Sequence, residues 1–399
     1  MMKETQPING IPTRATFLPF SPPLLGEEEE REVIDTLRSG WITTGPKTQQ
    51  FEKDLASYLN VPNVLTVSSC TAALHLSMIV LNIGPGDEVI TTPYTFASTG
   101  HVILYVGAKP VFADISPDTF NINPDNIESL ITEKTKAIIT MDYGGHPCDI
   151  DPILEIAKKH NLKVVVDAAH SIGSTYRNEK VGNKGDIVCY SFYATKNLAT
   201  GEGGAMTSMD PDLISQARIM AMYGISDARQ IWQRYTPKGS WHYDVPYLGF
   251  KYNFTDIQAS LGIHQLRKLD HFIERRRENA QIYHEILKDC ANIRLPFERS
   301  YVRSNYHLFP ILLNLDSLSI DRGEFIEYLR AENIGVSVLW PPLPNHTLYK
   351  EMGFNLENYP QSNYVFQRII NVPVSPIAST DDIRDAATAI LKICNHFSK

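Results

Sequence analysis

The sequence predicts an α/β fold in which helices cover both faces of a buried parallel sheet. From about residue 60 to residue 210, short apolar runs alternate with helical patterns, the order of elements that builds such a sheet. The runs are continuously apolar, as in KVVV at 163–166, which is typical of strands buried on both faces. Asp167 and Ser191 each follow one of these runs, at the strand ends where open α/β sheets collect functional groups.

The expected elements cover most of the chain. We expect strands at 63–67, 88–91, 110–114, 137–141, 163–166 and 186–190. We expect helices at 27–39, 47–59, 71–81 and 152–160, and a long helix at 255–287. After Asn292 the pattern changes, and it predicts strands at 306–313 and 336–340 with helices at 321–332 and 380–394. These patterns predict a large α/β domain over residues 1–269 and a smaller C-terminal α+β domain over residues 270–399.

Composition narrows the class of protein. The chain has 399 residues, a net charge of -8 and 43% hydrophobic residues, so it can bury a large core and lacks the basic field that nucleic acids attract. Its N-terminus is polar, and its apolar stretches are shorter than a membrane span. The five cysteines are dispersed and the histidines form no close pairs, which favours neither a disulfide framework nor a metal site. We therefore expect a cytoplasmic protein with no membrane or nucleic-acid partner.

Two polar residues after neighbouring strands can carry chemistry. Asp167 follows three valines, and a buried carboxylate is costly unless a partner such as a protonated pyridine nitrogen compensates it. Capping of the next helix is the alternative, and for an isolated aspartate it is the more common one. Lys196 lies five residues past Ser191 and ahead of a glycine-rich turn. Such a lysine can point into a site and act as nucleophile and base, whereas an isolated lysine is usually a solvated one.

A third element lies between the first expected strand and its helix, in the segment VSSCTAA at 67–73. Free amides at a helix N-terminus, beside hydroxyl groups, form an anion site. Simple capping by Ser68 or Ser69 explains the same residues equally well when they are read alone. The three elements together, in this order along one sheet, favour a functional site.

These segments belong to a longer set of motifs between about Phe20 and Ile390. The set comprises SGWITTGP at 39–46, SSCTAALHL at 68–76, PYTF at 93–96, DYGGHPCDID at 142–151, DAAH at 167–170, SFYATKN at 191–197, GEGGA at 201–205, GFKYNFTDIQAS at 249–260 and YHLF at 306–309. With them the chain resembles the DegT/DnrJ/EryC1/StrS family of sugar aminotransferases. The subgroup that makes 4-amino-4-deoxyarabinose-type sugars is the most similar. The resemblance implies the aspartate-aminotransferase-like fold type I of pyridoxal-phosphate (PLP) enzymes.

The resemblance implies a role for each matching residue. Lys196 matches the lysine that forms the Schiff base with the cofactor, and Asp167 matches the aspartate that keeps the pyridine nitrogen protonated. The other cofactor-binding positions are Phe96 and Ala169 against the two ring faces, His170 near the ring hydroxyl, and Cys70, Thr71 and Ser191 around the phosphate. Asn253 matches a residue that reaches the phosphate from the neighbouring subunit. The positions that resemble the substrate side are Thr44, Lys251 and His307.

The implied activity is transfer of an amino group from L-glutamate to a keto group, at C4, of a nucleotide-linked sugar. The product would serve lipopolysaccharide, another surface polysaccharide or a related glycan, and the implied assembly is a homodimer with a shared active site. One alternative is a PLP-dependent sugar dehydratase of the same family; those relatives often replace the lysine with histidine, so Lys196 favours transamination. Another is a PLP-binding regulatory protein, which the acidic charge and the lack of a helix-turn-helix pattern disfavour.

The chain also departs from the family pattern at several positions. Tyr193 and Tyr223 stand where relatives often have histidine, and Cys70 stands where they often have glycine or alanine. Because the phosphate is expected to contact the main-chain amide at Cys70, that change is compatible with binding. The segment LWPP at 339–342 replaces a His-aromatic pair beside the substrate pocket, so the resemblance leaves the identity of the sugar open.

Overall fold

The computed structural model describes residues 5–225 and 243–399. In this described part, seven strands form a central sheet in the order β1-β9-β8-β5-β4-β2-β3. The strands are β1 (Asn63–Val67), β2 (Glu88–Thr91), β3 (Lys109–Phe112), β4 (Thr135–Met141), β5 (Lys163–Asp167), β8 (Ile187–Ser191) and β9 (Gly204–Ser208). Strands β3, β2, β4, β5 and β8 run parallel to one another, whereas β9 is antiparallel to both of its neighbours.

Helices cover both faces of this sheet, as predicted. The helices are α1 (Glu27–Ser39), α2 (Pro46–Leu59), α3 (Cys70–Val80), α4 (Ala97–Tyr105), α5 (Ile150–His160), α6 (Pro211–Met220) and α8 (Asp256–Leu287). Successive strand residues point to opposite faces: Val164 packs in the core with α2, α5 and α8, and Val165 packs in the core with α3, α4 and α6. Burial on both faces explains why these strands read as continuous apolar runs.

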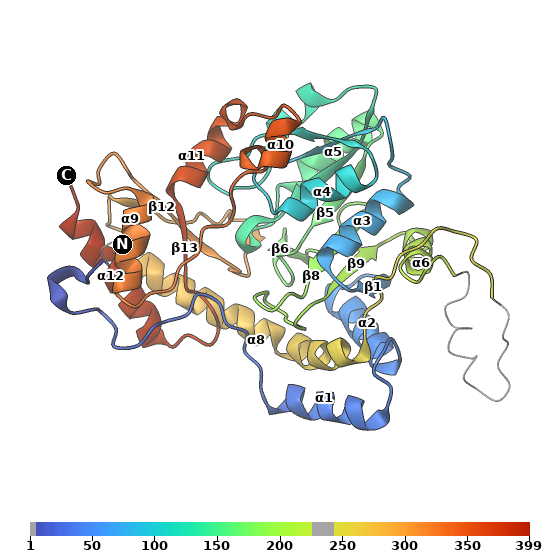
Figure 1. Cartoon of the computed structure of the whole chain (residues 1–399), viewed down its shortest axis with the longest axis horizontal. Coiled ribbons are helices and arrows are strands. Elements are labelled where there is room, and N and C mark those ends of the chain that lie inside the picture. Colours follow the sequence, from blue (N-terminus) through green and yellow to red (C-terminus); the bar gives the residue numbers. More distant parts are fainter. Residues whose placement is uncertain (1–4, 226–242) are drawn as a thin grey trace.

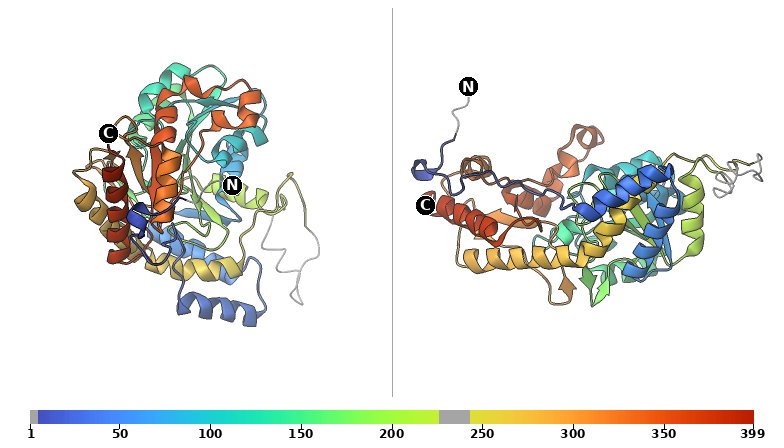
Figure 2. Two further views of the ribbon diagram at one scale, coloured as in Figure 1. Left: turned by 60° about the vertical axis from the view of Figure 1, so that its left-hand side comes forward. Right: turned by 90° about the horizontal axis from the view of Figure 1, so that it is seen from below.

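A second core lies around the C-terminal segment (Figure 1). Its elements are β10 (Ile293–Arg294), β12 (Phe309–Leu313), β13 (Ile369–Val372), α9 (Arg322–Ala331) and α12 (Thr380–His396). Helices α10 (Thr347–Glu351) and α11 (Pro360–Arg368) pack in two smaller clusters, through Tyr349 and Val365. A small separate sheet contains β6 (Thr175–Tyr176), β7 (Glu179–Lys180) and β11 (Val302–Arg303). Helix α8 runs along both cores, contributing Ile273 to the first and Tyr283 to the second, and Figure 2 shows its full length. Because one helix belongs to both cores, the division near residue 270 stays a prediction.

Two expectations about strands need correction. Residues 336–340 form no strand; the segment makes only an isolated bridge between Ser337 and Asn371. The carbonyl of Leu339, two residues beyond this bridge, accepts hydrogen bonds from two tyrosine hydroxyls in place of a neighbouring strand. Strand β9 was not predicted, because it begins inside the glycine-rich segment that reads as a turn, and it makes the sheet mixed in place of fully parallel.

No helix in residues 5–225 and 243–399 combines the length and apolar character that crossing a membrane requires.

Candidate active site

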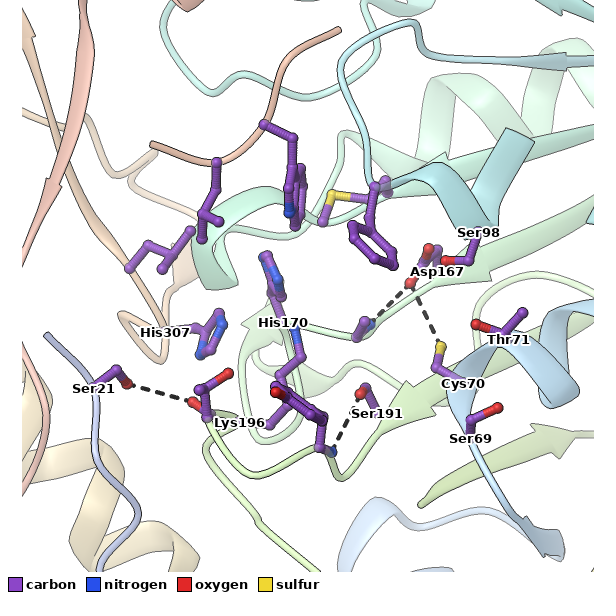
Figure 3. A pocket seen from close by; sticks show the side chains of 18 of the residues that line it. Ser21, Ser69, Cys70, Thr71, Ser98, Asp167, His170, Ser191, Lys196 and His307 are labelled. Atoms are coloured by element: carbon purple, nitrogen blue, oxygen red, sulfur yellow. Dashed lines mark hydrogen bonds between the residues drawn. The ribbon is translucent and has the colours of Figure 1, made fainter. Parts of the chain in front are cut away.

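A cavity of about 310 Å³ opens beside the carboxyl ends of β5 and β8 (Figure 3). It brings together nine of the residues predicted from the sequence: Cys70, Thr71, Phe96, Asp167, Ala169, His170, Ser191, Lys196 and His307. They come from the start of α3, the start of α4, the ends of β5 and β8, and the segment before β12. Thr44, Lys251 and Asn253 do not line this cavity.

Asp167 is a buried carboxylate at the last position of β5. Its Oδ2 accepts a hydrogen bond from the Thr99 hydroxyl at 2.8 Å, and its Oδ1 accepts one from the Ala169 amide at 3.1 Å. The Cys70 thiol lies 3.8 Å from Oδ1, and a dashed line marks this contact in Figure 3. Burial raises the pKa of Asp167, and the Thr99 hydrogen bond opposes that rise. Within the described chain no cation forms a salt bridge with this carboxylate, so the site has room for a cationic partner.

Lys196 follows β8 in a tight turn, in which its amide donates to the carbonyl of Tyr193 at 2.8 Å. The side chain is partly accessible through the cavity, but protein surrounds its amine. This desolvation lowers the pKa of Lys196 to about 8, although the nearby Asp167 charge acts in the opposite direction. A lysine with a lowered pKa supplies a neutral amine, which is the nucleophilic form.

The start of α3 forms an anion-binding corner. Ser69 caps the helix, and its Oγ accepts from the Ala72 amide at 3.1 Å. The first-turn amides have no intrahelical acceptor, and the positive end of the helix dipole adds to them. At Gly204 a Cβ would lie 2.5 Å from the amide nitrogen of Cys70, so only glycine lets β9 approach this corner so closely. The hydroxyl groups of Thr71 and Ser191 complete the polar lining of the cavity.

Two histidines form the neutral wall of the cavity. Their rings lie 4.2 Å apart, and burial holds the pKa of both His170 and His307 well below the usual value. The Gly144 amide donates to Nδ1 of His170 at 3.2 Å, so the proton of this neutral ring is on Nε2. Nδ1 of His307 lies 3.0 Å from Oδ1 of Asn197, an oxygen that only accepts. His307 therefore carries its proton on Nδ1 and leaves Nε2 as an acceptor.

A family model matches residues 23–391 of the chain. The chain belongs to the DegT/DnrJ/EryC1/StrS aminotransferase family. It is therefore an aminotransferase, and the reading as a PLP-binding regulatory protein is set aside.

Relatives and solved structures cover nearly the whole aminotransferase. An uncharacterised protein of Methanocaldococcus jannaschii is 48% identical, over 95% of this chain and 98% of the relative. The spore coat polysaccharide biosynthesis protein SpsC of Bacillus subtilis is 42% identical, over 96% and 98%. The PMP form of Spr1654 of Streptococcus pneumoniae, described as a sugar aminotransferase, has a TM-score of 0.90 at 36% identity, with 95% of this chain and 99% of that chain covered.

This aminotransferase uses pyridoxal 5′-phosphate, which family members contain in their solved PLP and PMP forms. The residues of the cavity fit that group. Asp167 offers a buried carboxylate without a salt bridge in the described chain, Lys196 offers a neutral amine, and the start of α3 offers amides to a phosphate. When bound, the cofactor supplies an electron sink for charge that develops on the substrate carbon.

The sequence did not identify every residue of this site. Trp340 lines the cavity, stacks on His170 with ring centroids 5.2 Å apart, and lies 5.9 Å from the ring of Phe96. The departure from the family pattern at 339–342 marked this segment without giving Trp340 a role. Thr99 was missed altogether, because its hydrogen bond to Asp167 joins α4 to β5 across 68 positions of sequence.

Attachment of the cofactor to the apoenzyme is expected to accelerate as the pH rises through about 8. The pKa of Lys196 is lowered, so its neutral amine is abundant above that pH, whereas an exposed lysine needs a pH near its ordinary value of about 10.4. The rate of appearance of bound-cofactor absorbance, measured across this range, checks the expectation. A rate that levels off only near the pKa of an exposed lysine would show that burial does not activate Lys196.

Proposed function

We propose that this aminotransferase moves an amino group from L-glutamate to a keto group, at C4, of a nucleotide-linked sugar. The observation that carries the proposal is the charge of the cavity. Among the described residues that line it, Lys196 is the only lysine or arginine, and both histidines are neutral. Hydroxyls, aromatic rings and neutral histidines on this lining suit an uncharged sugar ring, whereas the carboxylates of L-glutamate need a cation from outside it.

The names of relatives support a role in amino-sugar synthesis for a surface polysaccharide or related glycan. SpsC of Bacillus subtilis is named for spore coat polysaccharide biosynthesis. The PseC aminotransferase of Helicobacter pylori takes part in pseudoaminic acid biosynthesis, and its structure has a TM-score of 0.88 at 29% identity, with 96% of this chain and 100% of that chain covered.

In this proposal the catalytic roles follow the geometry of the cavity. Lys196 would hold the cofactor at rest, and its amine would then take up and return the proton of the substrate carbon. Asp167 holds the ring nitrogen protonated. The remaining cofactor contacts are Phe96 and Ala169 on the ring faces, His170 at the ring hydroxyl, and Cys70, Thr71 and Ser191 at the phosphate. His307, with Nε2 free to accept, binds a hydroxyl of the sugar.

The proposed assembly is a homodimer in which each site takes residues from both chains. The side-chain amide of Asn253 donates to the Thr44 hydroxyl at 2.7 Å, and both residues border a second cavity of about 490 Å³. Lys251 lies nearby, with Nζ 5.2 Å from the ring centroid of Tyr223. Val245, Tyr247 and Leu248, on the same segment, are all exposed, and such a run of exposed apolar side chains favours an interface. We assign Asn253 to the partner's cofactor phosphate, and Thr44 and Lys251 to its substrate, where Lys251 would meet a carboxylate of L-glutamate.

Mixed dimers are expected to recover activity that two inactive homodimers lack. Lys196→Ala removes the amine, and Asn253→Asp places a carboxylate beside the partner's phosphate, so each homodimer should be nearly inactive. In a mixed dimer one site carries both defects and the other carries neither. Random assembly makes about half of the dimers mixed, so co-expression should restore roughly a quarter of wild-type activity.

The mixed population must be confirmed by mass before activity is compared. A co-expressed pair of Lys196→Ala and a second Lys196 variant is the matched control, because no site in its mixed dimers has an intact Lys196. If confirmed mixed dimers of Lys196→Ala and Asn253→Asp stay as inactive as the homodimers, Asn253 acts within its own chain and the shared site is wrong.

The proposed substrates are tested in two half reactions. Incubation with L-glutamate should release 2-oxoglutarate and convert the bound cofactor to its amino form, which absorbance follows. A panel of nucleotide-linked keto sugars, which differ in nucleotide and keto position, should then return the absorbance of the aldehyde form only with the true acceptor. A dehydratase would release product without consuming glutamate. Return of the aldehyde form with 2-oxo acids but with none of the sugars would overturn the sugar acceptor.

A further inference from the structure

Two threonine hydroxyls form a chain of hydrogen bonds that ends on Asp167. Thr99 Oγ1 lies 2.8 Å from Oδ2 of Asp167, and Thr95 Oγ1 lies 2.7 Å from Thr99 Oγ1. Both threonines are buried, with exposed fractions of 1% for Thr95 and 0% for Thr99. They are four residues apart: Thr95 lies just before Phe96, the N-cap of α4, and Thr99 lies in the first turn of that helix. Figure 3 shows Asp167 close to Ser98 of the same helical turn.

The direction of these hydrogen bonds follows from proton counting. An ionised carboxylate only accepts, so the single hydroxyl proton of Thr99 is donated to Asp167. Thr99 therefore accepts from Thr95, whose proton completes the chain. A donor whose oxygen itself accepts a hydrogen bond is polarised and donates more strongly.

We propose that Thr99, supported by Thr95, is a positioning residue that keeps the proton shared between Asp167 and the cofactor on the ring nitrogen. A carboxylate that accepts more hydrogen bonds is a weaker base, because each bond stabilises its charge. Without the Thr99 hydroxyl, burial makes Asp167 a stronger base and draws the shared proton toward the carboxylate oxygen. The pyridine ring of the cofactor would then be neutral and would withdraw less negative charge from the substrate carbon. This inference rests on the proposed role of Asp167.

The surroundings of Asp167 make Thr99 the decisive donor. Of the groups that oppose the effect of burial on the pKa of Asp167, the Thr99 hydroxyl is the largest, ahead of the Ala169 amide and the Lys196 charge. The Cys70 thiol lies at 3.8 Å and is a weak donor.

Thr99→Val tests the proposal, because valine keeps the shape and removes the hydroxyl. We expect kcat to fall by about 10- to 100-fold with KM little changed, the range that a hydrogen bond to a charged group supports. In enzyme loaded with ¹⁵N-labelled cofactor, the ring-nitrogen chemical shift should move toward the unprotonated value. Thr99→Ser, which restores a hydroxyl, should recover both quantities, and Thr95→Val should give a smaller change in the same direction.

Thr140→Val is the matched control. Thr140 is also a buried threonine, in β4, but its hydroxyl makes no hydrogen bond to Asp167 and it does not line the cavity. Its replacement should leave the nitrogen shift and kcat unchanged, whatever it does to stability. In an Asp167→Asn background the further change Thr99→Val should cost little, since interacting residues are not additive. Additive losses would show a purely structural role.

The outcomes separate this inference from the role of Asp167. If Asp167→Asn leaves the ring nitrogen protonated, the proposed role of Asp167 is wrong, and so is the role of the two threonines that depends on it. If Asp167→Asn removes the nitrogen proton but Thr99→Val leaves the shift and kcat unchanged, the threonine chain alone is wrong. Should Thr99→Val fail to bind cofactor, Thr95→Val decides, and an unchanged shift and kcat in that variant overturn the proposal.

Discussion

Lys196→Ala is expected to abolish transamination while the protein still binds the cofactor non-covalently. The variant removes the only lysine or arginine among the described residues lining the cavity, and with it the amine that we propose moves the proton at the substrate carbon. Loss of such proton transfer alone costs about 10²- to 10⁴-fold in rate. The amides at the start of α3 and the carboxylate of Asp167 remain as contacts for the cofactor. Measured turnover, together with absorbance of the retained cofactor, checks both parts.

Borohydride reduction gives an independent measurement. In the wild type it should fix a pyridoxyl group on the peptide that contains Lys196, and in the variant it should label no peptide. Lys163→Ala is a suitable control, because this exposed lysine starts β5 and pairs with Asp186 at 2.9 Å. A surface salt bridge contributes about 0–1 kcal/mol, so this control should turn over normally. Label on any lysine other than Lys196 would overturn the assignment.

The sequence predicted the central strands well, because burial on both faces imposes a simple pattern. The segments expected at 63–67 and 88–91 coincide with β1 and β2, and the helix expected at 27–39 coincides with α1. Strand β9 escaped because its first residue, Gly204, lies in a glycine-rich segment. Glycine is needed there for a close approach to Cys70, which is a tertiary requirement that no local pattern expresses.

In the cavity, too, local sequence patterns revealed some residues, whereas others are brought to the site only by the tertiary fold. Asp167, Ser191 and Lys196 could be found because each lies at or just past the end of a buried strand, and parallel strands bring their carboxyl ends to one edge. Their partner Thr99 could not be found, because only the folded sheet places α4 beside the end of β5. Trp340 lies in a segment whose apolar run predicted a strand. The hydroxyls of Tyr94 and Tyr143 donate to the carbonyl of Leu339, at 3.0 and 2.6 Å. The segment therefore bonds to side chains and forms no strand.

Asp167→Asn is expected to lower turnover by two to four orders of magnitude while the fold is kept. Asparagine has nearly the same shape and can still accept from the Ala169 amide through its oxygen, but it carries no charge. Removing one partner of a buried charge pair costs about 3–5 kcal/mol, and each 1.36 kcal/mol is roughly tenfold in rate. The loss should appear mainly in kcat, since the ring nitrogen must remain protonated while charge develops on the substrate carbon.

Asp142→Asn separates this effect from the general cost of altering a buried carboxylate. Asp142 is also buried, and burial raises its pKa to about 6, but it accepts from Ser171 at 2.6 Å and does not line the cavity around Lys196. Its replacement should reduce thermal stability and leave turnover per cofactor-loaded molecule within a few fold of wild type. If Asp167→Asn behaved in the same way, the charge of Asp167 would take no part in the reaction, and its carboxylate would serve only the turn that follows β5, where the structure has no helix to cap. A large fall in kcat at Asp167 alone would instead tie the charge of this carboxylate to the reaction.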